Sequence, residues 1–331
     1  MTRASVLAGP CVVIVATALL GSVVSSATGV YFITALVSVS IVVALYVFIG
    51  NSGVVSFGHI SFVALGVWTA GVLTVPRSEK AAIMPGLAGF LQRTTVGNVP
   101  SLFLAALVGG IAAVVVGLPL MRLSGLAAGI ATFAVLEITN NVLRYYDKIG
   151  PGLNNFSSVP ETTGIWQAGV GALAAIVAAY LYARSRFGRL LRATREDPAS
   201  AAAAGVSMYR QRLVAFGLSG AIAGFAGGLY VHLLPLNSED VFLDLTFITL
   251  AMLVIGGTTS LWGAVVGALA VSALDSFLAE AENGIKILGG TIDLPSGTRV
   301  IAEGALMALV LIFRPGGLTN GREFVLRWRR K

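Results

Sequence analysis

The chain is poor in charged residues. Of its 331 residues only 11% are Asp, Glu, Lys or Arg, while 56% are hydrophobic. A soluble globular domain carries about 25% charged residues, so this composition excludes an ordinary water-soluble fold and indicates an integral membrane protein. The net charge of +7 would suggest nucleic-acid binding in a soluble protein. Here the basic residues lie between and after apolar stretches, and we therefore expect no nucleic-acid partner.

Cysteine and histidine are almost absent. The single cysteine, Cys11, can form no internal disulfide, and the two histidines, His59 and His232, are too few for a multi-histidine site. We therefore expect no metal site and no cofactor in this chain.

Motifs for hydrolysis and for nucleotide binding are also missing. The sequence has no HExxH, no GxSxG and no Cys/His pairing, so we expect no enzyme activity. It has no GxxxxGK[ST] loop, whose backbone amides and lysine hold nucleotide phosphates. If ATP drives this protein, another subunit must bind and hydrolyse it.

Long apolar stretches are abundant. A helix needs about 20 apolar residues to cross a membrane core about 30 Å thick, and roughly ten stretches meet that length. They predict an all-α polytopic membrane protein in which residues 1–331 form a single transmembrane domain. The first stretch also has features of a signal peptide, and we interpret it as an uncleaved helix. The expected spans are 10–28, 30–50, 56–75, 100–120, 124–143, 166–184, 213–234, 243–258, 260–278 and 298–314.

The longest stretch that could not lie in lipid is 184–212, RSRFGRLLRATREDPASAAAAGVSMYRQR. It carries seven arginines against two acids, Glu196 and Asp197. Loops this rich in arginine stay on the cytoplasmic side. Asp197-Pro198 predicts the start of a short helix, and Gly205 predicts its end. Two interpretations fit: a docking element for a cytoplasmic protein, or an ordinary basic loop that fixes topology.

This loop sets the expected orientation. With 184–212 inside, ten spans place both termini in the cytoplasm, and most of the 22 Lys and Arg residues then lie on the inner side. An odd number of spans would put the basic tail RWRRK at 327–331 outside, which the same rule disfavours.

Glycines recur at every fourth position in two of the apolar stretches. Small residues at this spacing let helix backbones approach closely inside lipid. We interpret these positions as helix-packing sites: Gly220, Gly224, Gly228, Gly263 and Gly267.

Polar and small residues interrupt the third stretch. The segment GNSGVVSFGHISFVALG at 50–66 contains Ser56, Gly58, His59 and Gly66. Irregular backbone at membrane depth is tolerated only where it is buried in protein or lines a cavity, so these residues are candidates for a translocation path. The alternative is that His59 sits at the cytoplasmic interface and bonds a neighbouring loop.

The fifth stretch adds further polar candidates for the path, Thr132, Glu137 and Asn141. Glu137 and Asn141 are four residues apart and share one helix face. Ionisable residues in spans usually face the bundle interior or water. Near the outer interface, however, both side chains would simply be solvated.

Five segments in this order resemble the branched-chain amino acid ABC transporter permeases of the LivM type. The resemblance covers about 30–318. The segments are GVVSFGHISFVALGVW at 53–68, GRLLRATREDPASAAAAGV at 188–206, AFGLSGAIAGFAGGLY at 215–230, IGGTTSLWGAVVGA at 255–268 and FRPGGL at 313–318.

The resemblance implies a permease subunit of a binding-protein-dependent importer in the bacterial inner membrane. It would carry branched-chain or related small polar amino acids by alternating access. Its partners would be a second, LivH-like permease, an extracytoplasmic binding protein, and two cytoplasmic ATPases that hold ATP and Mg. The loop 184–212 would be the coupling segment that docks in an ATPase. The coupling positions are then Arg189, Arg195, Glu196, Asp197, Ala201, Ala202 and Gly205.

One departure from the family concerns the solute. Family members often have a Thr-Gly-Gly segment after the fifth span, where this chain has GPGLNNFSSVP at 150–160. Related permeases carry urea, short amides or other small solutes, and these stay open as alternatives.

A self-sufficient secondary transporter remains a rival, although few carboxylates lie deep in the predicted spans. A membrane enzyme would need a nucleophile or a metal cluster near an interface, and the sequence shows neither.

Overall fold

Helices make up nearly all of the structure, a computed structural model that describes residues 5–152, 156, 158–234, 241–282, 284–287, 290–292, 294–295 and 297–324. Each predicted apolar stretch overlaps a helix, although the first, predicted at 10–28, runs past the end of its helix at Val23 and into the start of the next. These helices are α1 (Ser5–Val23), α2 (Ser26–Ser52), α3 (His59–Thr74), α6 (Asn98–Leu120), α7 (Gly125–Tyr145), α8 (Ile165–Arg184), α11 (Met208–Val231), α12 (Leu243–Gly256), α13 (Leu261–Glu282) and α14 (Thr298–Phe313).

The predicted polytopic helical architecture is confirmed. Within the described part of the chain, α1, α2, α6, α7, α8, α11 and α13 are long and apolar enough to cross a membrane, and α3 and α12 are shorter apolar helices. α3 begins three residues later than predicted because the residues before His59 form no helix. The number of ten membrane crossings therefore stays a prediction.

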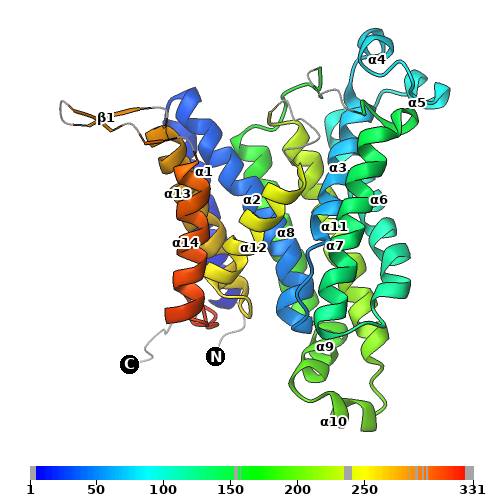
Figure 1. Cartoon of the computed structure of the whole chain (residues 1–331), viewed down its shortest axis with the longest axis vertical. Helices are drawn as coiled ribbons and strands as arrows, with labels where there is room; N and C mark the ends of the chain where they lie inside the picture. The colour runs from blue at the N-terminus through cyan, green and yellow to red at the C-terminus, as the bar shows by residue number, and fades with distance from the viewer. Residues whose placement is uncertain are drawn as a thin grey trace.

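Helix α2 is the most enclosed long helix of the bundle. All residues from 35 to 52 are buried, and α2 packs against α8, α11 and α13. A helix that is apolar on every face must be surrounded by protein or lipid, and here protein surrounds it. In Figure 1, α2 runs through the middle of the molecule. The C-terminal end of α2 is closed by Gly53, which is in the left-handed conformation with φ 71°.

Close approach of helix backbones joins α11 to α6 and α3. Gly224 lies so near Ala105 and Gly109 of α6 that a Cβ on Gly224 would overlap the Ala105 carbonyl oxygen. On its other side, Gly224 meets Gly66 of α3, where an added Cβ would overlap the Gly224 carbonyl. Gly220 also faces α6, at the Ala113 side chain and the Gly109 carbonyl, and Gly228 faces the side chains of Leu102 and Ala105. These contacts are what small residues at four-residue spacing provide inside lipid.

Helices α12 and α13 form a hairpin with the same kind of packing. A Cβ on Gly267 would overlap the backbone of α12 at Met252, and one on Gly263 would lie 2.6 Å from the Gly257 carbonyl oxygen. The hairpin turns at Gly257, whose φ of 119° suits glycine. The carboxylate of Glu323 closes the start of α13 by accepting hydrogen bonds from the amides of Leu261 (2.8 Å) and Trp262 (3.1 Å).

The two ends of the bundle carry different short elements. One end bears α9 (Arg186–Glu196) and α10 (Pro198–Ala203). The opposite end bears α4 (Arg77–Ile83), α5 (Gly89–Arg93), the short η1 (Asp147–Ile149), and the antiparallel strands β1 (Ile285–Ile287) and β2 (Gly290–Ile292). In Figure 1, the start of α1 and the end of α14 lie toward the α10 end. We refer below to the α10 end and the α4 end.

Candidate functional site

The stretch between α8 and α11 is built from two capped helices. Ser185 caps α9 by accepting a hydrogen bond from the Gly188 amide (3.2 Å). Asp197 caps α10, its Oδ1 accepting from the amides of Ala199 and Ser200 at 3.0 Å each. Pro198 occupies the first turn of α10, and Gly205 follows it with φ 77°. The helix that Asp197, Pro198 and Gly205 predict is therefore α10, while the arginine-rich arm before it is helix α9. We call residues 184–212, the segment predicted to dock in an ATPase, the coupling segment.

The coupling segment presents α10 to its surroundings. α10 packs against α9 and projects beyond the bundle at the bottom of Figure 1. Ala201 faces inward and is buried, while the other predicted coupling residues on or next to α10 are exposed. These are Glu196, Asp197, Ala202 and Gly205, and Arg189 of α9 is exposed as well.

The charge of Asp197 is held by its own cap. Hydrogen bonds from the Ser200 side chain and amide, with a smaller contribution from the Ala199 amide, lower the pKa of this carboxyl from its ordinary value of 3.8. Asp197 is therefore ionised at neutral pH. Its negative charge lies at the N-terminus of α10, where the helix dipole favours it.

Two arginines of α9 bind the end of α2. Arg192 donates from Nη1 to Asn51 Oδ1 (2.8 Å) and from Nη2 to the carbonyl of Ala183 in α8 (2.7 Å). Arg195 donates from Nη1 to the carbonyl of Gly50 (2.6 Å). Sequence reasoning chose Arg195 but missed Arg192 and Asn51. The three-residue spacing of Arg192 and Arg195, which puts both on one helix face, was the available signal.

The other arm of the coupling segment leads into α11, which binds the last turn of α6 and the α6–α7 turn. Tyr209 donates its hydroxyl hydrogen to the Leu118 carbonyl (3.0 Å), and Arg212 donates to the Leu123 carbonyl (3.1 Å). The guanidinium of Arg122 lies 5.8 Å from the centre of the Tyr209 ring. The segment is therefore fixed to the bundle on both sides of α10.

His59 lies in an aromatic enclosure at the start of α3. Its Nδ1 lies 2.8 Å from Ser56 Oγ, and its ring packs against those of Phe48, Phe62 and Phe216 at centroid distances of 5.1 to 6.0 Å. Only 1% of His59 is exposed, and its Nε2 has no hydrogen-bond partner among the described residues. In this conformation the imidazole is enclosed by side chains and does not face an open channel.

Helix α7 meets the same region through Thr132. The Phe57 amide donates to Thr132 Oγ1 (3.2 Å), and that hydroxyl donates to the Gly129 carbonyl (2.8 Å). Gly58 sits directly against Thr132, where a Cβ would overlap the Thr132 carbonyl. The structure thus brings together four of the predicted path residues: Ser56, Gly58, His59 and Thr132.

The remaining predicted path residues lie elsewhere. Gly66 is part of the packing between α3 and α11. Asn141 is exposed and donates to the Glu137 carbonyl within α7 (2.8 Å), while Glu137 is half-buried. Glu239 and Asp240, in the loop between α11 and α12, and the tail 327–331 lie outside the described residues.

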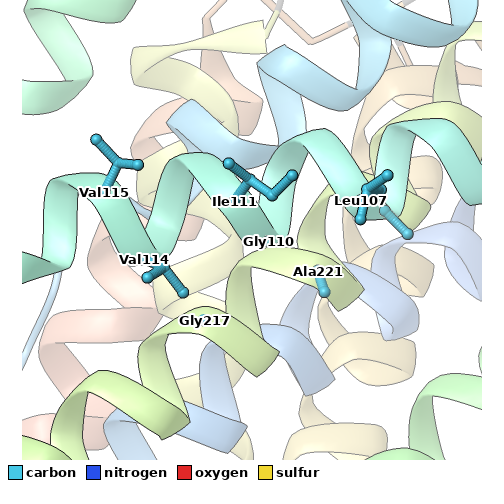
Figure 2. A pocket seen from close by; sticks show the side chains of 8 residues that line it. Leu107, Gly110, Ile111, Val114, Val115, Gly217 and Ala221 are labelled. Carbon is cyan, nitrogen blue, oxygen red and sulfur yellow. The ribbon is translucent and has the colours of Figure 1, made fainter.

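A cavity of about 380 Å³ lies between α6 and α11, and none of the predicted path residues lines it. Figure 2 shows Ile111 and Val114 of α6 beside Gly217 and Ala221 of α11. Its lining is apolar, with no side chain that could bind a polar solute. Among the described residues, no group of three or more His, Cys, Asp or Glu could hold a metal ion.

Comparison with known proteins gives a family and several relatives. The family profile described as "Branched-chain amino acid transport system / permease component" matches residues 29–313. The LivM high-affinity branched-chain amino acid permease of Salmonella typhimurium is 26% identical over 83% of this chain and 65% of its own length. A probable LivH permease of Methanocaldococcus jannaschii is 32% identical over 41% of the chain and 42% of its own length. The xylose permease XylH of Haemophilus influenzae is 26% identical over 48% of the chain and 40% of its own length. No solved structure gave a significant match.

Proposed function

The chain belongs to the family of branched-chain amino acid transport permeases, and from this premise we propose that it is the membrane subunit of an ATP-driven, binding-protein-dependent amino-acid importer. The match to the LivM relative spans 65% of that protein's length, so the activity of the whole relative is a proposal here. The chain itself is a permease without a catalytic role, and ATP hydrolysis falls to partner chains.

The coupling segment is the observation that carries this proposal. α10 is short, capped, exposed and carried beyond the bundle, while α9 and the start of α11 bind it firmly to α2 and to the α6–α7 turn. A basic loop that served topology alone would need neither the caps nor the hydrogen bonds. A helix presented in this way suits docking into a groove of a cytoplasmic ATPase.

The proposed topology has ten membrane crossings with both termini in the cytoplasm. In its support, the described ends of α2, α6 and α8 lie near the coupling segment, as their contacts with Arg192 and Tyr209 require. Successive helices then alternate in direction. α3, α12 and α14 are the shorter crossings in this topology, and the α4 end faces the binding protein.

The proposed mechanism is alternating access. ATP-driven closure of two ATPases would move α10 and rock the bundle, opening a path between this permease and a second, LivH-like one. Ser56, Gly58, His59 and Thr132, gathered where α3 and α7 meet, are the residues of this chain that we assign to the path. Glu137 and Asn141 follow on α7 toward the α4 end. The enclosed His59 corresponds to a closed state in this proposal.

The proposed solute is a branched-chain amino acid or a related small polar molecule. The LivM and LivH relatives are named for branched-chain amino acids, whereas another relative is named for xylose. Because this family framework serves several solutes, we assign specificity to the extracytoplasmic binding protein. Urea or a short amide remains the second candidate.

The experiment that tests this proposal is co-purification from detergent-solubilised membranes of the native host. The wild-type chain is compared with Glu196→Arg plus Gly205→Trp, which reverses a charge and adds bulk beside α10. A matched control, Glu161→Arg plus Gly164→Trp, makes the same changes at exposed positions of the α4 end. We expect an ATPase with the wild type and the control and none with the α10 variant. A stable wild-type chain without any ATPase would favour a self-sufficient carrier.

A further inference from the structure

We propose that Arg192 and Arg195 form an arginine clamp that transmits movement of α10 to the segment between α2 and α3. The clamp consists of these two arginines with Gly50 and Asn51, their partners at the end of α2. This inference rests on the proposed function, because it assumes that α10 is the docking helix. The clamp names the residues that would transmit movement of the docked α10 to the path residues.

Arg192 joins three helices with one planar group. It belongs to α9, and its two terminal nitrogens bind the Asn51 side chain of α2 and the Ala183 carbonyl of α8 at 2.8 and 2.7 Å. Asn51 is buried and its own amide nitrogen donates to the Val47 carbonyl (3.0 Å), which fixes the orientation of its acceptor oxygen. A guanidinium that makes two directed hydrogen bonds fixes distance and angle together, which a lysine cannot do.

Arg195 holds the last turn of α2. The final carbonyls of a helix have no partner within the helix, and Arg195 supplies one to Gly50 (2.6 Å). Its positive charge also suits the C-terminal end of the helix dipole. Its methylene groups lie over Gly53, where a Cβ would come within 3.1 Å of Arg195 Cγ and Cδ. α9 and the end of α2 therefore move as one body.

The chain is stiff on one side of the clamp and soft on the other. α2 is buried from residue 35 to residue 52, so it resists bending. Immediately beyond the clamp, Gly53 leaves the helix with φ 71°, and no helix forms until His59. Displacement of α9 is therefore absorbed between Gly53 and Gly58. Hinges of this kind are a few residues at the ends of elements.

A second attachment gives the displacement a reference point. Tyr209 and Arg212, beyond α10, hold the last turn of α6 and the α6–α7 turn, while the clamp holds α2. The elements that follow these two points, α3 and α7, meet at the Phe57–Thr132 hydrogen bond. A tilt of α10 changes the separation of the two attachment points and so acts on this contact, next to Ser56 and His59.

The test measures whether nucleotide binding by the ATPase changes the accessibility of the hinge, residues 53–58. Val55, which is 49% exposed in the segment 53–58, is replaced by cysteine in a Cys11→Ser background. The complex with its co-purified ATPase is labelled with a maleimide, with and without trapping by ATP and vanadate. We compare the wild-type clamp with Arg192→Ala and Asn51→Leu. Asn51→Asp keeps the acceptor oxygen, and Arg186→Ala removes an exposed arginine of the same helix.

We expect trapping to change the labelling rate of Val55→Cys by about fivefold or more when the clamp is intact. Asn51→Asp and Arg186→Ala retain this change. Arg192→Ala and Asn51→Leu lose it, although the ATPase still co-purifies and hydrolyses ATP. If these variants still bind the ATPase and hydrolyse ATP, the loss of the labelling change reports lost transmission and not a misfolded protein.

Several results would overturn the clamp. One is a nucleotide-dependent change that survives in both Arg192→Ala and Asn51→Leu. Another is an unchanged labelling rate in the wild-type clamp despite an active, bound ATPase. If Arg192→Ala does not accumulate in the membrane, Arg192→Lys replaces it, and full retention of the change in that variant counts against the clamp. A wild-type chain that binds no ATPase would instead refute the proposed function.

Discussion

Thr132 accepts a hydrogen bond of 3.2 Å from the backbone amide of Phe57, 75 residues earlier in the chain. This bond fastens α7 to the start of α3, at the point where the predicted path residues of the two helices meet. α7 is otherwise a peripheral helix, with exposed apolar side chains such as Leu126 and Ile138. Thr132 is thus a polar contact that positions α7 on the bundle.

Replacement of Thr132 by valine should loosen that contact. Valine has nearly the same shape but cannot accept a hydrogen bond, so the Phe57 amide loses its partner, at a cost of about 1 kcal/mol. We expect a lower thermal midpoint in detergent for Thr132→Val and a near-normal one for Thr132→Ser. Thr17→Val is the control, since the Thr17 hydroxyl donates to the Val13 carbonyl of its own helix. Equal midpoints for Thr132→Val and Thr17→Val would contradict this role.

The packing of α11 on α6 predicts an intolerance of even one methyl group. An alanine at Gly224 must displace the backbone of Ala105, which should destabilise the protein by about 1–3 kcal/mol. At Gly304, in α14, nothing lies within 4 Å of an added Cβ, so Gly304→Ala should be neutral or slightly stabilising. Tryptophan fluorescence during thermal unfolding compares the two. An unchanged thermal midpoint for Gly224→Ala would show that α6 and α11 can move apart without a loss of stability.

The cap of α10 predicts a graded response at Asp197. Asparagine also caps helices, so Asp197→Asn should keep ATPase co-purification and Asp197→Ala should weaken it. The folded-state pKa of Asp197 is lowered, so its stabilising contribution is present above the ordinary value of 3.8 and is lost as pH falls through the lowered value. Co-purification that depends on Asp197 should therefore be constant between about pH 6 and 8. If ATPase co-purification falls between pH 6 and 8 in the wild type but not in Asp197→Asn, Asp197 titrates in that interval and its assignment as an ionised cap is wrong.

Glu323 predicts a pH dependence of the opposite sign. Burial raises the pKa of this carboxyl, despite its hydrogen bonds from the Leu261 and Trp262 amides. For a raised pKa, the stabilising contribution is complete below the ordinary value of 4.5 and declines as pH rises through the raised value. Relative to wild type, Glu323→Gln should therefore gain thermal stability as pH increases from 4 to 8. If the wild type instead becomes more stable relative to Glu323→Gln over this range, burial does not determine the pKa of Glu323.

The helices were predictable because lipid imposes a simple rule. Every predicted apolar stretch overlaps a helix, since a chain of this composition must satisfy its backbone hydrogen bonds internally. The limits of α10 were also predictable, because Asp197, Pro198 and Gly205 act through local backbone preferences. These features need no knowledge of distant contacts.

What the sequence could not show depends on contacts between distant residues. Arg192 resembles its neighbours in sequence, and only the fold brings it to Asn51, 141 residues away. The enclosure of His59 needs rings from α2 and α11, namely Phe48 and Phe216. Likewise, Gly66 was assigned to the path from a local pattern, whereas in the structure it faces the backbone of α11.

The central claim, that ATP hydrolysis by partner chains drives solute through this permease, is tested most directly by uptake of radiolabelled leucine. Cells of the native host that lack the chain are complemented with wild type or with Glu196→Arg plus Gly205→Trp. We predict uptake with wild type alone, and we predict that it stops when cellular ATP is depleted and persists when a protonophore collapses the proton gradient. Uptake that survives ATP depletion and stops with the protonophore would contradict the account and identify a secondary transporter.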